Sequence, residues 1–228
     1  MLEDDLIQIA GVIDPAEAEM LQQCGVRYLG FPLRLPVHRE GLTETEAAMI
    51  IKGLAPAVFG VLITYLDEAN EIAAFCHALS ARIVQLHGDI DRDELKRLKT
   101  LDPSLTVIKS LVVGMHDDKT LEAMLSDLSP FVDAFITDTF DPKTGASGAT
   151  GKTHDWRVSR RLVKLSDRPV ILAGGLTPEN VKQAILEVRP AGVDSHTGVE
   201  DSTGRKSRQK VQRFLSEAHD AFQLVKAM

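Results

Sequence analysis

Asp138 ends an apolar run of the sequence, and a carboxyl group in that position can do acid–base chemistry. Residues 134–137 read Ala-Phe-Ile-Thr, and Asp138 follows them at the start of a long loop. Partial burial there would keep the carboxyl group protonated, so Asp138 is a candidate general acid. The alternative is a carboxylate that only accepts hydrogen bonds from loop amides, because Asp is common at strand ends.

Two glycine-containing turns follow the last two apolar runs. Gly174 and Gly175 come after residues 170–173, and a second turn comes after residues 192–194. Bare backbone amides in such turns can approach an anion closely, so the pair of turns predicts a phosphate site. Either turn alone is consistent with an ordinary connection. The predicted phosphate contacts are Gly174, Gly175, Ser195, His196, Thr197 and Gly198, and Asp194 before them is a predicted substrate contact. His196 would bind phosphate when charged or accept a proton when neutral.

A basic loop after residues 26–31 contains Arg34, His38 and Arg39. A guanidinium group can bind a carboxylate or a phosphate through two hydrogen bonds, so Arg39 is a candidate substrate contact. A solvated basic loop is the alternative.

Three more polar residues lie within apolar segments and are predicted substrate contacts. Gln85 and His87 end the segment VQLHG, where side chains on one face would point inward. A polar residue satisfied within the core is the alternative for each. Lys109 lies in VIKSL and needs either a charge partner or a substrate contact, because an unpaired buried charge is costly. The loop from residue 139 to residue 154 is long and glycine-rich, so it is either a lid or a plain connector.

Eight strand–helix units would position these groups. The predicted strands are residues 7–10, 26–31, 58–63, 83–87, 106–112, 133–137, 170–173 and 192–194. The predicted helices begin near residues 14, 43, 67, 91, 118, 155, 177 and 205. Eight units in 228 residues predict a compact (β/α)₈ TIM barrel forming one domain over residues 1–228, with reactive groups at the carboxyl ends of its strands. A doubly wound sheet is disfavoured because no G-x-G-x-x-G turn follows the first strand.

Capping signals mark several of these helices. Asp14, Pro15 and Glu17 form a capping-box signature, and Gly25 is the expected stop of that helix. Thr177 is a predicted N-cap with Pro178 at the first helical position.

The composition is that of an ordinary globular protein with a net charge of −7, from 26 basic and 33 acidic side chains. This balance argues against a nucleic-acid or anionic-membrane partner, although a local pocket for one phosphate is compatible with it. The chain has no run of 18 apolar residues and begins with an acidic segment, so we expect a cytoplasmic protein. No metal-ligand cluster or cofactor fingerprint occurs, so we expect neither a metal nor a cofactor. Cys24 and Cys76 match no metal or redox spacing and are predicted to be buried structural thiols.

Several motifs occur in a fixed order along nearly the whole chain. They are QIAG (8–11), Gly30-Phe31 followed by Arg39, VQLHG (84–88), VIKSL (107–111), Asp138-Thr139, GATGKTHDW (148–156), LAGGLTPENV (172–181) and VD-x-x-x-GVE (193–200). Together they resemble the phosphoribosylanthranilate isomerase family of tryptophan biosynthesis, and LAGGLTPENV and VQLHG are the most specific. The resemblance implies a (β/α)₈ barrel that binds a phosphoribosyl compound.

The resemblance also implies a reaction and roles for residues. The family carries out an Amadori rearrangement, which opens a ribosylamine ring and moves a proton to give an aminoketose. Asp138 matches the general acid, Arg39 matches the contact to the anthranilate carboxylate, and the two glycine turns match the phosphate site. Where the family has its general-base cysteine in KICG, this chain has Ala10, and a methyl group cannot accept a proton.

Three hypotheses follow. The first is an isomerase of the family type, with His196 or His38 as a substitute base or with a reduced rate. The second is a barrel enzyme that acts on a different phosphorylated sugar or amine. The third is a non-catalytic barrel that binds a phosphorylated ligand. In each case the partner is a small phosphorylated molecule, and both a monomer and a homodimer are open.

Overall fold

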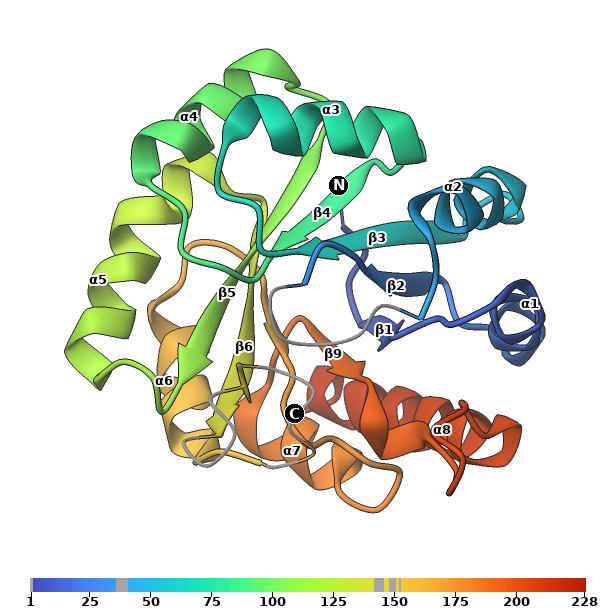
Figure 1. Cartoon of the computed structure of the whole chain (residues 1–228). Coiled ribbons are helices and arrows are strands. Elements are labelled where there is room, and N and C mark those ends of the chain that lie inside the picture. The colour runs from blue at the N-terminus through green and yellow to red at the C-terminus, as the bar shows by residue number, and fades with distance from the viewer. Residues whose placement is uncertain (1, 36–40, 142–145, 148–150, 152) are drawn as a thin grey trace.

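In the part of the chain that the structure describes, eight parallel strands close into a barrel that eight helices surround (Figure 1). The computed structural model describes residues 2–35, 41–141, 146–147, 151 and 153–228 of the chain. The barrel strands are β1 (Leu6–Ala10), β2 (Tyr28–Pro32), β3 (Phe59–Thr64), β4 (Ile83–Leu86), β5 (Thr106–Val113), β6 (Ala134–Asp141), β8 (Val170–Leu172) and β9 (Gly192–Ser195). They pair in this order, and β9 pairs back with β1, so the sheet has no free edge. The predicted fold class is confirmed.

One further strand lies outside the barrel. β7 (Ala146–Ser147) pairs antiparallel with the end of β6, and the sequence did not predict it. It lies within the long loop after β6.

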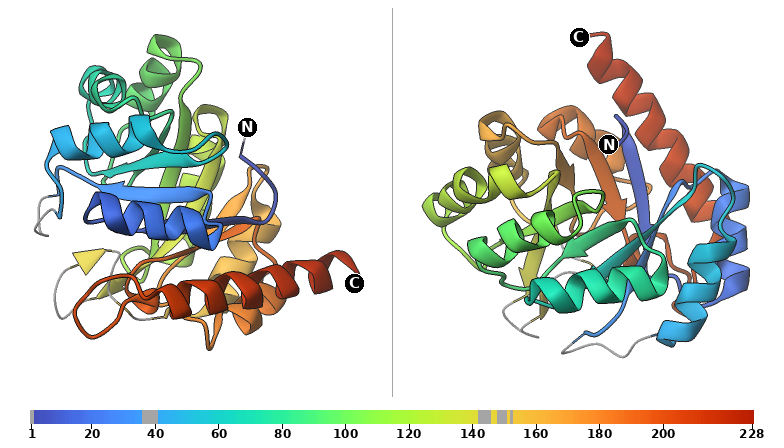
Figure 2. Two further views of the ribbon diagram at one scale, coloured as in Figure 1. Left: turned by 90° about the vertical axis from the view of Figure 1, so that its right-hand side faces the viewer. Right: turned by 90° about the horizontal axis from the view of Figure 1, so that it is seen from above.

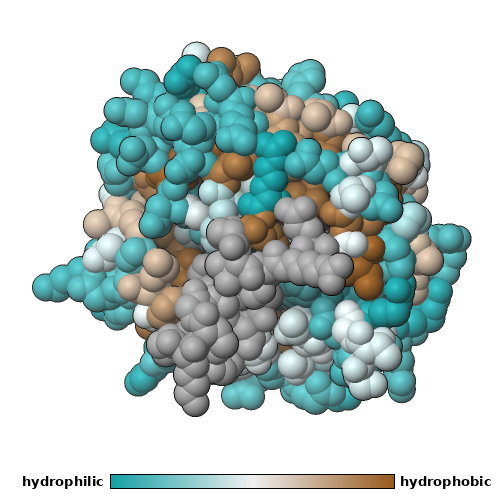
Figure 3. All heavy atoms as spheres, in the orientation of Figure 1, coloured by the Kyte–Doolittle hydropathy of each residue, from teal (hydrophilic) through white to brown (hydrophobic). Residues whose placement is uncertain are grey.

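The helices follow the barrel strands one by one. They are α1 (Pro15–Cys24), α2 (Glu44–Gly53), α3 (Ala69–Leu79), α4 (Arg92–Leu101), α5 (Asp118–Leu128), α6 (Trp156–Leu165), α7 (Val181–Val188) and α8 (Arg208–Lys226), with short 3₁₀ helices η1 (Ser129–Phe131) and η2 (Thr197–Val199). Figure 2 shows that α8, the last of them, extends past the body of the barrel. On the face seen in Figure 3, hydrophilic side chains dominate the outline and apolar patches lie nearer the middle.

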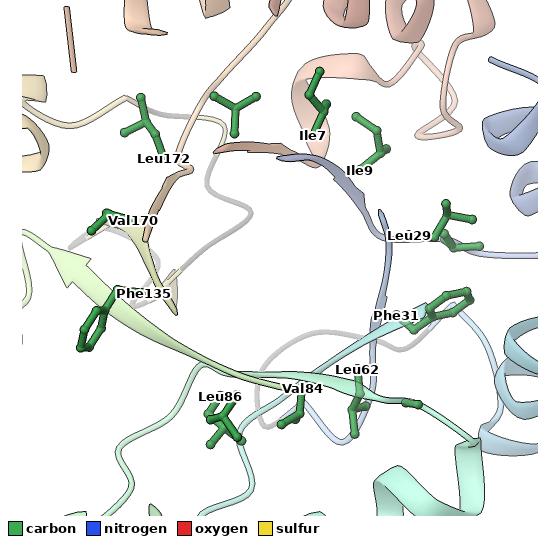
Figure 4. Close-up of a cluster of buried hydrophobic side chains, with 14 of the residues drawn as sticks. Ile7, Ile9, Leu29, Phe31, Leu62, Val84, Leu86, Phe135, Val170 and Leu172 are labelled. Atoms are coloured by element: carbon green, nitrogen blue, oxygen red, sulfur yellow. The ribbon is translucent and has the colours of Figure 1, made fainter. Parts of the chain in front are cut away.

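Strand alternation sorts the side chains into two sets. Side chains such as Ile9, Val84 and Phe135 point away from the barrel toward the helices (Figure 4). Residues between them belong to a second buried cluster inside the barrel, which includes Ala10 and Ile136. The inside of the barrel is therefore apolar at one level and, as described below, polar at the level nearer the carboxyl ends of the strands.

Local signals explain where most helices begin and end. Asp14 Oδ1 accepts a hydrogen bond from Glu17 N at 2.7 Å, and Gly25 ends α1 with φ +94°. Thr43 and Glu46 form a complete capping box at the start of α2.

Three boundary or burial predictions are wrong. Residues 178–180 form a turn, and α7 begins only at Val181, later than predicted. The Thr177 hydroxyl does accept a hydrogen bond from Glu179 N, as expected of a cap, and Asn180 Oδ1 accepts one from Thr177 N. The last helix begins at Arg208 because Ser207 caps it. Cys76 is buried as predicted, but Cys24 is half-buried in the last turn of α1. Among the described residues, no helix is long and apolar enough to span a membrane.

Candidate active site

A pocket at the carboxyl ends of β6, β8 and β9 collects all six predicted phosphate contacts and both predicted carboxyl groups. Its lining residues are Asp138, Gly151, Gly174, Gly175, Leu176, Asp194, Ser195, His196, Thr197 and Gly198. These residues come from four separate stretches of the sequence, which the closed barrel brings together.

The two glycine turns are locked against each other. Gly174 and Gly175 have φ of +97° and +63°, a left-handed backbone that favours glycine. A Cβ atom on Gly174 would lie 2.2 Å from Thr139 Oγ1, and one on Gly198 would lie 1.9 Å from Leu176 O. Ser195 Oγ also donates a hydrogen bond to Leu176 O at 2.8 Å. The turns are therefore close-packed backbone, and the Ser195 hydroxyl already has a partner.

Asp138 is buried, and each of its oxygens has a polar neighbour. Its Oδ1 accepts from Thr139 N at 2.7 Å, and its Oδ2 lies 3.1 Å from His87 Nε2. Ser110 Oγ lies 2.7 Å from His87 Nδ1 on the other side of the ring. The predicted contact His87 is thus brought directly to Asp138.

Two glutamines fix the direction of this chain of hydrogen bonds. Gln8 Nε2 donates to Gln85 Oε1 at 2.9 Å, and Gln85 Nε2 lies 3.3 Å from His87 Nδ1. An amide nitrogen only donates, so His87 Nδ1 is an acceptor and the ring hydrogen of a neutral His87 is on Nε2. The ring hydrogen of a neutral His87 is therefore on the nitrogen that lies 3.1 Å from Asp138 Oδ2.

Asp194 faces the barrel interior from β9 and is 8% exposed. Burial raises the pKa of this carboxyl group to about 7, and the negative charge of Asp138 adds to the rise. A hydrogen bond with the Gln8 side chain and the charge of Lys206 act in the opposite direction. Two carboxyl groups with different surroundings thus share one pocket.

His196 packs against the end of β1. A Cβ atom on Gly11 would lie 2.0 Å from His196 Nε2, so the ring edge rests on the backbone directly after Ala10. The same nitrogen lies 3.5 Å from Glu200 Oε1, which accepts from the buried Lys206 Nζ at 2.6 Å.

A third histidine, His154, supports the pocket from outside, and the sequence reasoning missed this role. His154 Nδ1 lies 2.9 Å from Thr139 Oγ1, and its Nε2 lies 2.5 Å from Ser159 Oγ. Burial lowers the pKa of His154 to about 4, although the charges of Asp138 and Asp155 oppose this, so the ring is neutral at pH 7. It ties the start of α6 to the residue after Asp138.

Lys109 lies apart from the pocket. Its neighbours Val107 and Leu111 pack in the outer core, so alternation places Lys109 on the outer wall of the barrel. It lines a separate cavity of about 280 Å³, whose other lining residues are Asp67, Glu68, Asp89, Ile90, Asp91, Glu94, Met124 and Leu128. Its Nζ donates to Ser110 O at 2.8 Å. The structure therefore does not bring Lys109 together with the other predicted substrate contacts.

Of the three basic residues in the predicted basic loop, only Arg34 lies within the described residues. His38 and Arg39 lie outside the described residues, as does much of the predicted lid after β6. Arg34 pairs with Glu44 at 2.8 Å and Glu71 at 2.7 Å and lies over the Phe75 ring, so it serves the helix layer. Within the described part of the chain, no three His, Cys, Asp or Glu residues are grouped so that they could hold a metal ion.

Comparison with known proteins agrees with this geometry. The family model of N-(5'phosphoribosyl)anthranilate (PRA) isomerase matches residues 7–217. An N-(5'-phosphoribosyl)anthranilate isomerase 2 of Methanosarcina mazei is 38% identical over 221 residues, which are 95% of each chain. An N-(5'-phosphoribosyl)anthranilate isomerase of Haloferax volcanii is 34% identical over 94% of this chain and 93% of its own.

Solved structures of the same kind superpose on the whole barrel. Phosphoribosyl anthranilate isomerase of Thermotoga maritima matches with a TM-score of 0.80 and 28% identity, covering 96% of this chain and 100% of its own. A phosphoribosyl anthranilate isomerase in complex with reduced 1-(o-carboxyphenylamino)-1-deoxyribulose 5-phosphate matches with a TM-score of 0.77 and 26% identity, over 96% and 100% of the two chains. The chain belongs to the N-(5'-phosphoribosyl)anthranilate isomerase family of tryptophan biosynthesis and is an isomerase of that type.

Proposed function

We propose that this enzyme isomerises phosphoribosylanthranilate to the aminoketose as a divergent family member that works without a cysteine at position 10. One observation carries the proposal: a single pocket is lined by Asp138, by His196 and by both glycine turns. An acid, a base and a phosphate site are the parts that the Amadori rearrangement needs.

Asp138 is the proposed general acid. It would give a proton to the ring oxygen of the ribosylamine, which lets the ring open. Thr139 N donates to one of its oxygens and His87 Nε2 lies 3.1 Å from the other, and these contacts orient the carboxyl group. Gln85 Nε2 lies beside His87 Nδ1, so Gln85 influences Asp138 only through His87. Asp194 contributes a second carboxyl group to the pocket.

His196 is the proposed base for the proton on carbon 2. Ala10 faces the barrel interior and cannot accept a proton, and the His196 ring edge rests against Gly11, the next residue. A neutral imidazole beside the mouth is a suitable base at pH 7. His38 stays the second candidate.

The glycine turns are the proposed phosphate site. Backbone amides of the turns at 174–175 and 195–198 would meet the phosphate oxygens, because close packing of these turns leaves backbone at the pocket surface. Arg39 stays the proposed contact to the anthranilate carboxylate. The cytoplasm as compartment, and a monomer or homodimer as the assembly, stay predictions.

The loss of phosphoribosylanthranilate fluorescence tests the proposal. Native protein should turn the substrate over, and Asp138→Asn should reduce kcat by about 10²–10⁴. His196→Asn should reduce kcat by a similar factor and remove the acid limb of the pH profile. Ala10→Cys in the His196→Asn background should restore part of the rate.

Two results would contradict the proposal. Absence of turnover by the native protein, with activity only after Ala10→Cys, would mean that the natural reaction is a different one. Unchanged turnover after His196→Asn together with His38→Asn would remove the histidines as bases.

A further inference from the structure

Asp194 is a buried carboxyl group with an unpaired oxygen. It lines the pocket from β9, and Gln8 on β1 is its register partner. Among the described residues, neither Asp194 Oδ1 nor Gln8 Oε1 has a hydrogen-bond partner, although both atoms are buried. Two acceptors cannot satisfy each other, so a proton on Asp194 would turn one unpaired acceptor into a donor beside the other.

Asp138 has the opposite surroundings. Thr139 N donates to its Oδ1, and its Oδ2 lies 3.1 Å from His87 Nε2. Gln8 donates to Gln85, and Gln85 Nε2 lies 3.3 Å from His87 Nδ1, which places the hydrogen of a neutral His87 on Nε2, the atom nearest Asp138. Polar hydrogens that stabilise a negative charge therefore face Asp138, whereas Asp194 keeps an oxygen with no donor among the described residues.

The charges around Asp194 also favour a proton on Asp194 rather than on Asp138. Burial and the Asp138 charge raise the pKa of Asp194 to about 7, and Lys206 ahead of α8 only moderates the rise. The other titratable groups nearby are His87, which lies beyond Asp138, and His196, which follows on the same segment. Near neutral pH both forms of Asp194 are thus populated, as a group that exchanges protons in turnover requires.

We propose that Asp138 and Asp194 work as a carboxyl pair that shares one proton, with Asp194 as a second catalytic residue that recovers the proton Asp138 gives away. This inference rests on the proposed isomerase function and adds a role that the function alone does not assign. It is carried by the common pocket, the unpaired oxygens of Asp194 and Gln8, and the polar hydrogens that face Asp138.

The protons of the reaction balance on this pair. In the starting state the shared proton is on Asp194, and it passes to Asp138 when the acid is needed. Asp138 then gives this proton to the ring oxygen as the C1–O bond breaks and the nitrogen lone pair forms a C1=N bond. The base removes the C2 proton, the C2–H electron pair forms a C1=C2 bond, and the C1=N pair returns to nitrogen. The base then returns its proton to C1 while the 2-hydroxyl gives its proton to Asp194 as the C2=O bond forms. The pair has lost one proton and regained one, and the regained proton is again on Asp194, as in the starting state.

Carbon-13 NMR of the protein labelled at the aspartate carboxyl carbon tests the pair without substrate. In the native protein we expect one carboxyl signal whose titration midpoint lies near pH 7. This signal should be lost in Asp194→Asn. It should be kept in the control variant Asp167→Asn, which makes the same change of charge at an exposed aspartate. In Asp138→Asn the midpoint should fall by about one unit or more, because a neighbouring negative charge is removed. A midpoint near the ordinary aspartate value, or one that Asp138→Asn leaves in place, would overturn the proposal.

Kinetics provide the second test. Asp194→Asn should lower kcat by about 10²–10⁴ and abolish the fall of native kcat at alkaline pH, whereas Asp167→Asn should change neither. The dissociation constant of inorganic phosphate, measured by calorimetry, should stay within about threefold of the native value in Asp194→Asn. Retained phosphate binding would show that the variant is folded although its turnover is lost. Native turnover that Asp194→Asn leaves intact would overturn the pair while the isomerase function stands. Absence of native turnover would overturn that function, and the NMR midpoints would still decide whether the carboxyls are coupled.

Discussion

Asp194 and Lys109 are both charged residues at buried strand positions, but they lie on opposite walls of the barrel. Asp194 faces the interior and lines the pocket with Asp138 and the glycine turns. Lys109 faces the helices and lines a cavity with several carboxylates. Burial shifts both pKa values toward neutrality, that of Asp194 up to about 7 and that of Lys109 down to about 8.

The difference teaches that a shifted pKa locates a functional group only together with its surroundings. The inner wall places Asp194 beside a second carboxyl group at the mouth, where a phosphorylated substrate would enter. The outer wall surrounds Lys109 with opposite charge, and Asp89 partly reverses the effect of burial. The first arrangement suits proton transfer, whereas the second compensates a buried cation.

The largest expected difference between the two walls is in catalysis. Asp138→Asn should reduce kcat by about 10²–10⁴, because the pocket loses its proton donor. Lys109→Met should leave kcat within about threefold, because Lys109 lies in the separate outer cavity. Steady-state fluorescence assays of both variants check this. A large loss of kcat in Lys109→Met with normal folding would restore the sequence prediction that Lys109 contacts substrate.

The contributions of Asp194 and Lys109 to the free energy of unfolding should depend on pH in opposite directions. The folded pKa of Asp194 lies above its unfolded value, so its contribution to stability is full below about pH 4 and is lost as pH rises to about 7. The folded pKa of Lys109 lies below its unfolded value of 10.5, so its contribution is lost as pH falls from about 10.5 to about 8. Each change is roughly 3 to 5 kcal/mol, at about 1.4 kcal/mol per pH unit.

Urea unfolding of matched variants across pH separates these contributions. In Asp194→Asn, the free energy of unfolding should fall less between pH 4 and pH 7 than it does in the native protein. In Lys109→Met, it should rise less between pH 8 and pH 10.5. If Asp194→Asn instead changed the pH dependence between pH 8 and 10.5, or Lys109→Met that between pH 4 and 7, the pKa shift of that residue would be contradicted.

Backbone crowding at the mouth gives a smaller effect. Gly174→Ala puts a Cβ atom 2.2 Å from Thr139 Oγ1 at φ +97°, so it should destabilise the fold by about 2–3 kcal/mol and lower activity by displacing the residue after Asp138. Gly25→Ala has nearly the same φ, +94°, with open space around it, and should lose about 1 kcal/mol with normal activity. Thermal unfolding and the fluorescence assay measure both. Equal losses in the two variants would mean that the mouth is less crowded than the structure indicates.

Sequence patterns predicted the elements of this fold better than its contacts. Short apolar runs and caps such as Asp14 and Thr43 are local signals, so the eight strands and most helix starts were predictable. Alternation in VIKSL also carries information that the sequence analysis did not use. Because Ile108 belongs to the inner cluster, Lys109 must face outward and Ser110 inward.

The missed contacts depend on closure of the barrel. His87 meets Ser110 and Asp138, and Gln8 meets Gln85, across strands that are distant in the sequence. The His154 bonds depend on how the start of α6 returns to β6 and have no periodic signal. A single sequence shows that polar residues end the strands, but their partners follow only from strand order and register.

The smallest expected effect concerns the carboxylates around Lys109. The negative charge of Asp89 raises the pKa of Lys109 against burial, so Asp89→Asn should lower the titration midpoint of Lys109 further, by less than about one unit. Carbon-13 NMR of the lysine Cε signal reads this midpoint, and kcat should stay at the native value because no atom of the pocket changes. Lys96→Met, a change at a lysine on α4 outside this cavity, should leave the midpoint in place. A midpoint that rises in Asp89→Asn would mean that Asp89 does not compensate the buried cation. A fall in kcat would mean that the two walls are coupled, and the separation between a catalytic inner charge and a structural outer charge would then no longer hold.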